Sequence, residues 1–500
     1  MPSASLDGLV SSHSPGAGPA AARPWRRIAA CAALVALGGA TCAAATAAQA
    51  PTDSAIAKIF ADLAAPGQPG CSVGVERGGA LVHASAYGLA DIAVGKRLDA
   101  GSVFNIASIS KQFTAFSILL LDQRKALSVD DPLIKHVPEL AASARGVTLR
   151  HLLHHTGGLR DYETLLMLRG RRIVDGATQF ETIRALGRQR AANFPPGEQY
   201  SYSNSGYVLL ATVVERVSGR SMKQFATENI FIPLGMKDTT IVDRYPADLP
   251  ALARGYTPAG QGFEIDESAW EQVGDGQVHT TVADLLRWAD NFRTARVGGA
   301  DLLKRMIEVG TLNSGERIDY AAGLGIGEYN GLPTVGHSGG WAGYGSHLVM
   351  FPEQQLAVSV LCNRNDVRTT RRALDVAELY LADEMRRTGK RTPPETEHDD
   401  GAPVASWQPA NLAAYEGAYV SDEAEARCVL VERGGRLVLE GCAPGLLLQP
   451  AGKDEFYAAD VRALLRFTGP AGRPTGFSLL NYGLDGLAFT RQQEQQVNTP

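Results

Sequence analysis

The pattern of apolar and polar positions changes character several times along the chain. Asp53 to Ala65 carries apolar residues at helical spacing behind an Asp/Ser cap, which predicts a short opening helix. The segment CSVGVERGGALVHASAYG alternates on either side of Gly78-Gly79, which predicts a β-hairpin. From Ser102 to about Thr240 the spacing is mainly helical, and strand-like runs return in SHLVMFPE and LAVSVLCN before a closing helix. Strands at both ends with helices between them predict one α/β (α+β) unit whose sheet joins the two ends of the sequence.

A different pattern follows the closing helix. Residues 388–406 are polar and contain prolines, which predicts a linker between a main domain over 51–387 and a second domain over 407–500. The second domain consists of short alternating runs separated by Gly and Pro, which predicts a small antiparallel β-barrel or sandwich. In its segment RCVLVERGGRLVLEGC the spacing sets Cys428 and Cys442 nearly opposite on a hairpin, where an exported chain can pair them.

The first fifty residues indicate export. Arg26-Arg27 precede an apolar run from Ile28 to Ala45, and small residues follow up to Ala50, so residues 1–50 are interpreted as a secretory signal peptide. A membrane anchor is the alternative, but the run is short and rich in Ala and Gly, unlike a spanning helix. We therefore expect a periplasmic or secreted protein with no integral membrane segment after processing.

Composition excludes some classes of function. The 500 residues are 45% hydrophobic and 20% charged, as in an ordinary soluble globular protein. The formal net charge of −5 gives no sign of a nucleic-acid partner. The chain contains no C-x-x-C or H-E-x-x-H motif, so neither a metal site nor another cofactor is expected.

One serine motif has to be set aside. Within VGHSGGWAGYG, residues 336–340 satisfy G-x-S-x-G, the nucleophile elbow of α/β-hydrolases, with Ser338 at its centre. An elbow requires a strand, a sharp turn and then a helix. Here WAGYGSHLVMFPEQQLAVSV follows, which is Gly-rich and then β-patterned, and His347 stands only nine residues on. We interpret the lipase-like signal as accidental.

A second serine is better placed for catalysis. The segment FNIASISK runs into an apolar helix, which puts Ser108 at the helix N-terminus and Lys111 one turn on, on the same face. A neutral lysine amine can accept the serine proton where its surroundings lower its pKa, and a helix N-terminus offers N–H groups to an oxyanion. Taken alone, S-x-x-K also fits an N-cap serine with a solvated lysine.

Two further motifs follow at informative separations. Tyr202 and Asn204 lie in a loop before a helix, about 95 residues after S-x-x-K, and offer a phenolic acid/base and an amide that hydrogen-bonds substrate or Lys111. H-S-G begins at His337 on a predicted strand, about 135 residues further.

This ordered triple, with its flanks, resembles the β-lactamase-like serine hydrolases: class C β-lactamases, D-aminopeptidases, serine D-Ala-D-Ala carboxypeptidases and family VIII esterases. VTLRHLLHHTGGLRDY and PPGEQYSYSNSGYVLLATVVERVSG look like blocks of that family, and the resemblance covers roughly residues 55–385. It implies the β-lactamase/DD-peptidase-like fold, an antiparallel sheet flanked by helices plus an all-helical lobe. In that fold the first strand pairs with the last, so Cys71 and Cys362 are expected to be neighbours and able to form a disulfide.

The resemblance also implies residue roles. Ser108 would be the acylating nucleophile and Lys111 its base, while Tyr202 would carry the proton to the leaving group and later activate water. Backbone N–H groups of Ser108 and Gly340 would form the oxyanion hole. The remaining implied positions bind or orient substrate: Asn204, which orients substrate or Lys111; His337, the first residue of the third motif; Ser338, through its hydroxyl; and Gly339 and Gly340, which leave room for the substrate backbone.

The third motif bears on the substrate. Lactamases usually carry Lys-Thr-Gly there, whereas His337 begins the motif in this chain and is largely neutral near pH 7, which argues against strong carboxylate recognition. The resemblance therefore implies an exported serine hydrolase that acts through an acyl-enzyme on a peptide, D-amino-acid amide or ester bond. The alternatives are a carboxylesterase or weak class C-like β-lactamase, and a catalytically silent cell-wall-peptide binding protein. The sequence leaves open the substrate, the role of the C-terminal domain and the oligomeric state.

Overall fold

The computed structural model describes residues 51–246, 249–393, 409, 411–442, 445–470, 472–481 and 483–492. The predicted signal peptide and most of the predicted linker lie outside these residues. Within the described part of the chain, no helix has both the length and the apolar character needed to cross a membrane.

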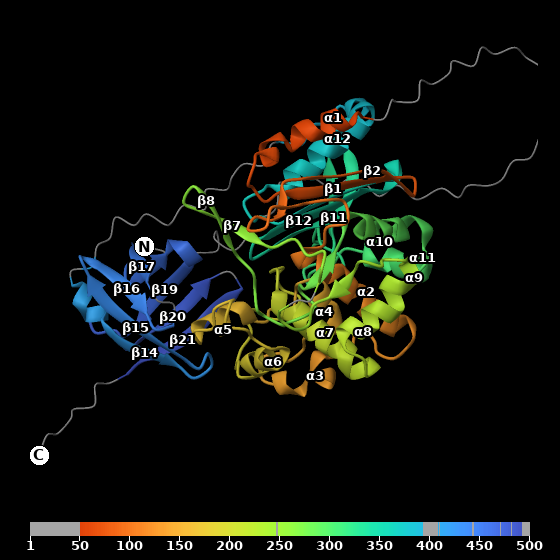
Figure 1. The fold of residues 1–500 in the computed structure, drawn as a ribbon. Coiled ribbons are helices and arrows are strands. Elements are labelled where there is room, and N and C mark those ends of the chain that lie inside the picture. The colour runs from red at the N-terminus through yellow and green to blue at the C-terminus, as the bar shows by residue number, and fades with distance from the viewer. Residues whose placement is uncertain are drawn as a thin grey trace, which may run out of the picture. The chain divides into compact units, whose positions relative to one another are not determined.

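A six-stranded antiparallel sheet joins the two ends of the α/β part, as predicted (Figure 1). Its strand order is β10-β11-β12-β13-β1-β2, so the first strand of the chain pairs with β13, a strand almost 300 residues later. The six strands are β1 (Cys71–Arg77), β2 (Ala80–Tyr87), β10 (Gly325–Tyr329), β11 (Leu332–Trp341), β12 (Tyr344–Phe351) and β13 (Leu356–Cys362).

Helices cover both faces of this sheet (Figure 1). On one face α1 (Asp53–Ile59) and α12 (Thr369–Thr388) pack together, and Val376 of α12 shares a buried apolar cluster with strand valines such as Val73 and Val358. On the other face α10 (Val282–Thr294) contacts β1 and β13. Because both faces are covered, β13 is buried at every residue and β1 at every residue but Arg77, including the polar positions of the alternating β1 pattern.

The helical lobe lies between the two halves of the sheet in the sequence. α2 (Lys111–Gln123) is buried along most of its length and packs against α7 (Asn204–Ser218), which begins after the capping side chain of Ser203. The other helices are α3 (Leu133–His136), α4 (Leu149–Leu153), α5 (Tyr162–Leu168), α6 (Gln179–Gly187), α8 (Met222–Ala226), α9 (Ile232–Leu234) and α11 (Gly299–Met306). Short strands complete this part: β3 (Leu89–Asp91), β4 (Lys96–Arg97), β5 (Phe104–Asn105), β6 (Thr240–Ile241), β7 (Tyr256–Ala259), β8 (Gly262–Ile265) and β9 (Val278–Thr280).

The C-terminal region is a closed antiparallel barrel of eight strands, β14 to β21, so the barrel alternative of the sequence prediction is confirmed (Figure 1). Its interior is filled by side chains, among them Phe456, Phe467 and Phe489, which makes it a packed core. The strands are β14 (Gly417–Ser421), β15 (Ala426–Arg433), β16 (Arg436–Glu440), β17 (Leu446–Gly452), β18 (Glu455–Ala458), β19 (Ala463–Thr468), β20 (Gly476–Asn481) and β21 (Leu484–Arg491).

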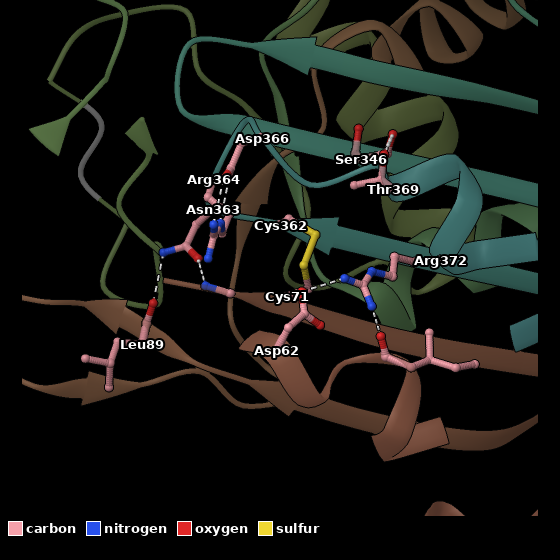
Figure 2. The surroundings of a disulfide bond; sticks show 12 residues. Asp62, Cys71, Leu89, Ser346, Cys362, Asn363, Arg364, Asp366, Thr369 and Arg372 are labelled. Carbon is pink, nitrogen blue, oxygen red and sulfur yellow. Dashed lines mark hydrogen bonds and ion pairs between the residues drawn. A yellow bond between two sulfur atoms is a disulfide. The ribbon is translucent and has the colours of Figure 1, made fainter. Parts of the chain in front are cut away.

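Both cysteine pairings considered from the sequence are present. Cys71 and Cys362 are register partners on β1 and β13, with Cα atoms 4.0 Å apart, and form a disulfide (Figure 2). The adjacent Asn363 accepts a hydrogen bond from the Gly70 N–H at 2.8 Å and donates to the Leu89 carbonyl at 3.0 Å. In the barrel, Cys428 is bonded to Cys442.

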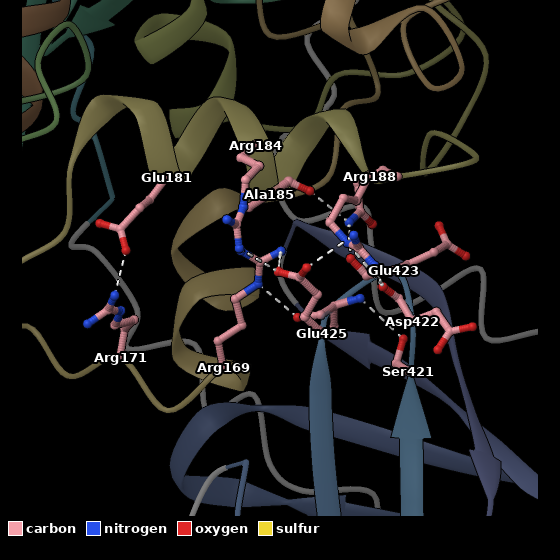
Figure 3. Close-up of polar contacts among 12 residues, drawn as sticks. Arg169, Arg171, Glu181, Arg184, Ala185, Arg188, Ser421, Asp422, Glu423 and Glu425 are labelled. Carbon is pink, nitrogen blue, oxygen red and sulfur yellow. Dashed lines mark hydrogen bonds and ion pairs between the residues drawn. The ribbon is translucent and has the colours of Figure 1, made fainter.

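The barrel contacts the helical lobe through charged side chains (Figure 3). Glu425, in the turn before β15, forms ion pairs with Arg169, Arg184 and Arg188 at 2.9, 3.1 and 3.1 Å. Three guanidinium groups on α5, α6 and their ends therefore share one carboxylate of the barrel.

Candidate active site

Ser108 lies in a tight turn, Ala107–Ser110, that leads directly into α2. Ala107 has a left-handed backbone, with φ of 47°, which is unfavourable for a residue with a side chain. Two contacts hold the turn: the Ala107 N–H donates to the Asn105 side chain at 2.8 Å, and the Ser346 hydroxyl donates to the Ile106 carbonyl at 2.8 Å. The surrounding strands thus fix the conformation that presents Ser108.

The Lys111 amine is the centre of the hydrogen-bond network. Lys111 is fully buried, and its Nζ donates to Ser108 Oγ at 3.1 Å, to Asn204 Oδ1 at 2.7 Å and to the Asp275 carbonyl oxygen at 2.9 Å. Burial lowers the pKa of Lys111 to about 8, although the carboxyls of Asp275 and Glu163 oppose this shift. Near neutral pH a fraction of about a tenth is the free amine, which can accept the Ser108 proton.

Tyr202 also lies close to the Lys111 amine. The Lys111 Nζ is 4.8 Å from the centre of the Tyr202 ring, and the Tyr202 hydroxyl is buried. Burial raises the pKa of Tyr202 above its usual value, and the Ser108 hydroxyl only partly offsets this. Behind it, the His155 ring packs 4.3 Å away between centroids, and its Nδ1 accepts the Ser203 N–H. Tyr202 therefore keeps its proton and can act as a donor.

The carboxyls around Lys111 are functional candidates that the sequence interpretation missed. Asn204 Nδ2 donates to Glu163 Oε1 at 2.8 Å, and the Tyr162 hydroxyl donates to Asp275 Oδ2 at 2.9 Å. Burial raises the pKa of Glu163 well above its usual range and also raises that of Asp275. Glu163 directly follows the family-like segment that ends in RDY, and Asp275 lies in GDGQVHTT, but no spacing rule places either residue beside Lys111.

The third motif lies on β11, next to the turn that holds Ser108. His337 Nδ1 faces the Ser338 carbonyl oxygen and so carries the ring proton, which leaves Nε2 to accept the Tyr320 hydroxyl at 2.9 Å. Desolvation lowers the pKa of His337 to about 4, and the positive charge of Lys111 acts in the same direction. His337 is therefore neutral near pH 7, and both of its nitrogens are used inside the protein.

The two glycines of this motif occupy different surroundings. A Cβ atom on Gly339 would lie 2.3 Å from the Ile106 carbonyl oxygen and 2.4 Å from Ser346 Oγ, so a side chain would collide with the turn that holds Ser108. A Cβ on Gly340 would meet nothing within 4 Å. Gly339 is needed for packing within the protein, whereas Gly340 leaves open space.

Three of the predicted site residues line a cleft that is open to solvent. Ser108, Asn204 and Gly340 line it directly, so the predicted nucleophile and one predicted oxyanion donor face the same space. The other lining residues are Ala107, Tyr162, Glu163, Trp270, Gln272, Asp275, Gly276, Gln277 and Trp341. Among the residues that the structure describes, no group of three or more His, Cys, Asp or Glu side chains is arranged to hold a metal ion.

The nucleophile-elbow alternative does not fit this geometry. Ser338 lies inside β11, which continues to Trp341 and leads into the strand β12 instead of a helix. His347 pairs with Ser338 across the two strands, but its Nδ1 is hydrogen-bonded to the Thr370 hydroxyl at 3.0 Å. Ser338 therefore belongs to the strand bordering the site.

Comparison with known proteins agrees with the fold and with the family that the sequence resembles. A family model described as Beta-lactamase matches residues 56–382. A penicillin-binding protein of Bacillus subtilis is 27% identical over 433 residues, which cover 82% of this chain and 92% of the relative. A D-aminopeptidase of Cereibacter sphaeroides is 28% identical over 302 residues, covering 59% of this chain and 57% of the relative. The octameric penicillin-binding protein homologue from Pyrococcus abyssi superposes with a TM-score of 0.59 at 23% identity, covering 88% of this chain and 99% of that one.

Proposed function

This chain belongs to the β-lactamase family of serine hydrolases, and from that premise we propose that it is an exported enzyme that cleaves peptide or D-amino-acid amide bonds through an acyl-enzyme on Ser108. The observation that carries the proposal is the position of the buried Lys111 amine, which contacts Ser108 and Asn204 at the edge of the cleft.

The geometry supports a two-step reaction. The neutral Lys111 amine takes the Ser108 proton as the hydroxyl oxygen attacks the substrate carbonyl, and the N–H groups of Ser108 and Gly340 stabilise the oxyanion. Tyr202, which keeps its proton in this environment, gives it to the departing amine when the amide C–N bond breaks. A water molecule then gives a proton to the Tyr202 phenolate and attacks the acyl-enzyme carbonyl. Lys111 returns its proton to the Ser108 oxygen as the ester bond breaks, which restores all three groups and releases the carboxylic acid product.

The charges around the cleft favour substrates that do not depend on carboxylate recognition. His337 is neutral and uses both ring nitrogens within the protein, so it offers no cation to a substrate carboxylate. Glu163 and Asp275 line the same cleft. This supports an amide substrate of the kind implied by the D-aminopeptidase relative over a β-lactam or a peptide held by its carboxyl terminus. A carboxylesterase would use the same machinery and remains the alternative.

Export is part of the proposal. It rests on the signal-peptide pattern of residues 1–50 and is supported by the two disulfides, since such bonds persist in oxidising compartments. Expression of the full chain in a bacterial host tests it: we expect a processed product outside the cytoplasm, and full-length protein retained in the cytosol would contradict it.

The enzymatic proposal is tested by labelling the processed protein with a fluorophosphonate probe and locating the adduct by mass spectrometry. We expect the label on Ser108 and no label in Ser108→Ala. In Lys111→Ala we expect the labelling rate to fall at least about a hundredfold. Ser338→Ala is the matched control and should still be labelled. Label on Ser338 that survives Ser108→Ala would overturn the assignment, and no label at all would favour the silent binding protein. A panel of D-amino-acid amides, short esters and a chromogenic cephalosporin then separates the substrates.

A further inference from the structure

The barrel contacts the helical lobe next to the cleft through the turn before β21 and the first residues of that strand. The Asp161 N–H donates to the Gly483 carbonyl oxygen at 2.7 Å, and Asn193 Nδ2 donates to the same oxygen at 3.0 Å. The Asp485 N–H donates in turn to Asn193 Oδ1 at 2.8 Å. These bonds join residues of the helical lobe and of the barrel that lie about 300 positions apart in the sequence.

Gly483 is a position at which a side chain does not fit. Its φ of +78° belongs to the left-handed region, and a Cβ built there would lie 2.9 Å from the Asp161 Cβ. The barrel backbone therefore lies directly against Asp161, with no side chain between them that could yield.

Asp161 connects this contact to the cleft. Its Oδ1 accepts the Thr164 N–H at 2.8 Å and so caps α5, whose first two residues, Tyr162 and Glu163, line the cleft. Glu163 holds the Asn204 amide, and Asn204 accepts from the Lys111 amine. A continuous series of contacts thus leads from Gly483 to the proposed catalytic base.

The same residues contribute to the charge environment of Lys111. Asp275, Glu163 and Asp161 are the carboxyls that, when ionised, raise the pKa of Lys111 against the effect of burial. Burial raises the pKa of all three carboxyls, that of Asp161 to about 6. The other titratable groups facing Lys111 are neutral near pH 7, because burial raises the pKa of the tyrosines and lowers that of the histidines: Tyr202, Tyr207, His155 and His337. A displacement of Asp161 and Glu163 would therefore act on Lys111 directly.

We propose that Gly483 of the barrel is a positioning residue for the active site: by its close contact with Asp161 it fixes the Tyr162–Glu163 wall of the cleft and, through Asn204, the Lys111 amine. The barrel is then a working part of the hydrolase and not an appended module. This inference rests on the proposed function, since it assigns Lys111 the role of base.

The test uses the complete processed chain with the substitution Gly483→Ala and the control Gly486→Ala. Gly486 lies on β21, three residues after Gly483, and likewise has a left-handed φ, of +65°, but a Cβ there would meet nothing within 4 Å. The control therefore carries the backbone strain without the contact to Asp161. Asn193→Ala removes the side-chain bonds to Gly483 and Asp485 and supplies a second variant if Gly483→Ala does not fold.

Two quantities are measured for each folded variant: the pH dependence of fluorophosphonate labelling at Ser108, and kcat and KM for a D-amino-acid amide. For Gly483→Ala we expect kcat/KM to fall about tenfold or more and the pH midpoint of labelling to shift by about half a unit, because displacement of these carboxyls changes the charge environment of Lys111. Asn193→Ala should show the same changes at about a third of their size, and Gly486→Ala neither.

The outcomes separate this inference from the proposed function. Labelling of the unsubstituted chain anywhere other than Ser108 overturns the proposed function itself. If Ser108 is labelled normally but Gly483→Ala and Asn193→Ala match Gly486→Ala in kinetics and pH midpoint, the positioning role is overturned. A lower thermal midpoint with unchanged kinetics and pH midpoint has the same meaning, since it shows that the contact serves stability alone.

Discussion

Lys111 determines what the site can do because its amine is buried and yet hydrogen-bonded to Ser108. The three hydrogen bonds that it donates orient the amine, and burial brings its pKa to about 8. An ordinary lysine would be protonated almost completely at neutral pH and could not accept a proton. The nucleophile is therefore activated by the surroundings of the neighbouring residue.

This predicts the pH dependence of acylation. Only the free amine accepts the Ser108 proton, so the labelling rate should rise as pH increases through about 8 and level off above it. His337, with a pKa of about 4, should add no inflection between pH 5 and 7. The rate of labelling at Ser108, measured from reactions quenched at fixed times across pH 5–10, gives this pH profile. Lys111→Arg is the inactive comparison because arginine stays charged. A midpoint near 6.5 that disappears in His337→Gln would assign the base to His337 instead.

At the scale of elements, β11 is pressed against the turn that carries Ser108. Gly339 allows this approach, and Ser346 on the neighbouring β12 fastens the turn by its hydrogen bond to Ile106. The turn includes the left-handed Ala107, so its conformation depends on these contacts from strands that lie far away in the sequence.

The two adjacent glycines of β11 provide a matched pair for testing this. Gly339→Ala should lower the free energy of unfolding by about 1–3 kcal/mol, because its Cβ collides with Ile106 and Ser346. Gly340→Ala should leave the free energy of unfolding nearly unchanged while lowering kcat/KM, since it adds a methyl group at the cleft. Denaturant unfolding and amide hydrolysis measure the two effects. Equal losses of stability in both variants would contradict the close packing of β11 on the turn.

At the scale of the whole molecule, the contact between the barrel and the helical lobe contains more arginines than carboxylates that pair with them. Glu425 alone forms ion pairs with three arginines, of which Arg169 is the most buried, with 11% of its side chain exposed. Arg160, with 5% of its side chain exposed, pairs with Glu423 at 2.9 Å in the same interface (Figure 3 labels Glu423). Removal of a single barrel carboxylate therefore leaves several positive charges facing one another.

Glu425→Gln should accordingly lower the midpoint of thermal unfolding, and added salt should restore part of the loss by screening the repulsion among the arginines. Glu440→Gln is the control. The Glu440 side chain is 34% exposed, close to the 32% of Glu425, and its partner, Arg433, belongs to the barrel itself. Circular dichroism at low and high salt measures both variants. Identical midpoints for the two would show that the Glu425 cluster does not stabilise the contact.

The sequence predicted those features that depend on residues close together in the chain. Ser108 and Lys111 are one helical turn apart, so local geometry alone puts both on one face. Alternation around Gly78-Gly79 and within the barrel strands predicted the hairpins, because the pleat of a strand sends successive side chains to opposite faces. The resemblance to the family supplied what periodicity cannot, namely the pairing of β1 with β13 and of Cys71 with Cys362.

The sequence by itself thus determined the chemical groups, the order of the motifs and the elements that carry them. Tertiary structure alone decided that Glu163 and Asp275 surround the Lys111 amine, that Gly339 is required by packing, and that the barrel lies against Asp161. The reason is physical: a pattern of residues records periodicity, whereas burial and charge interaction depend on distances between segments that only folding brings together.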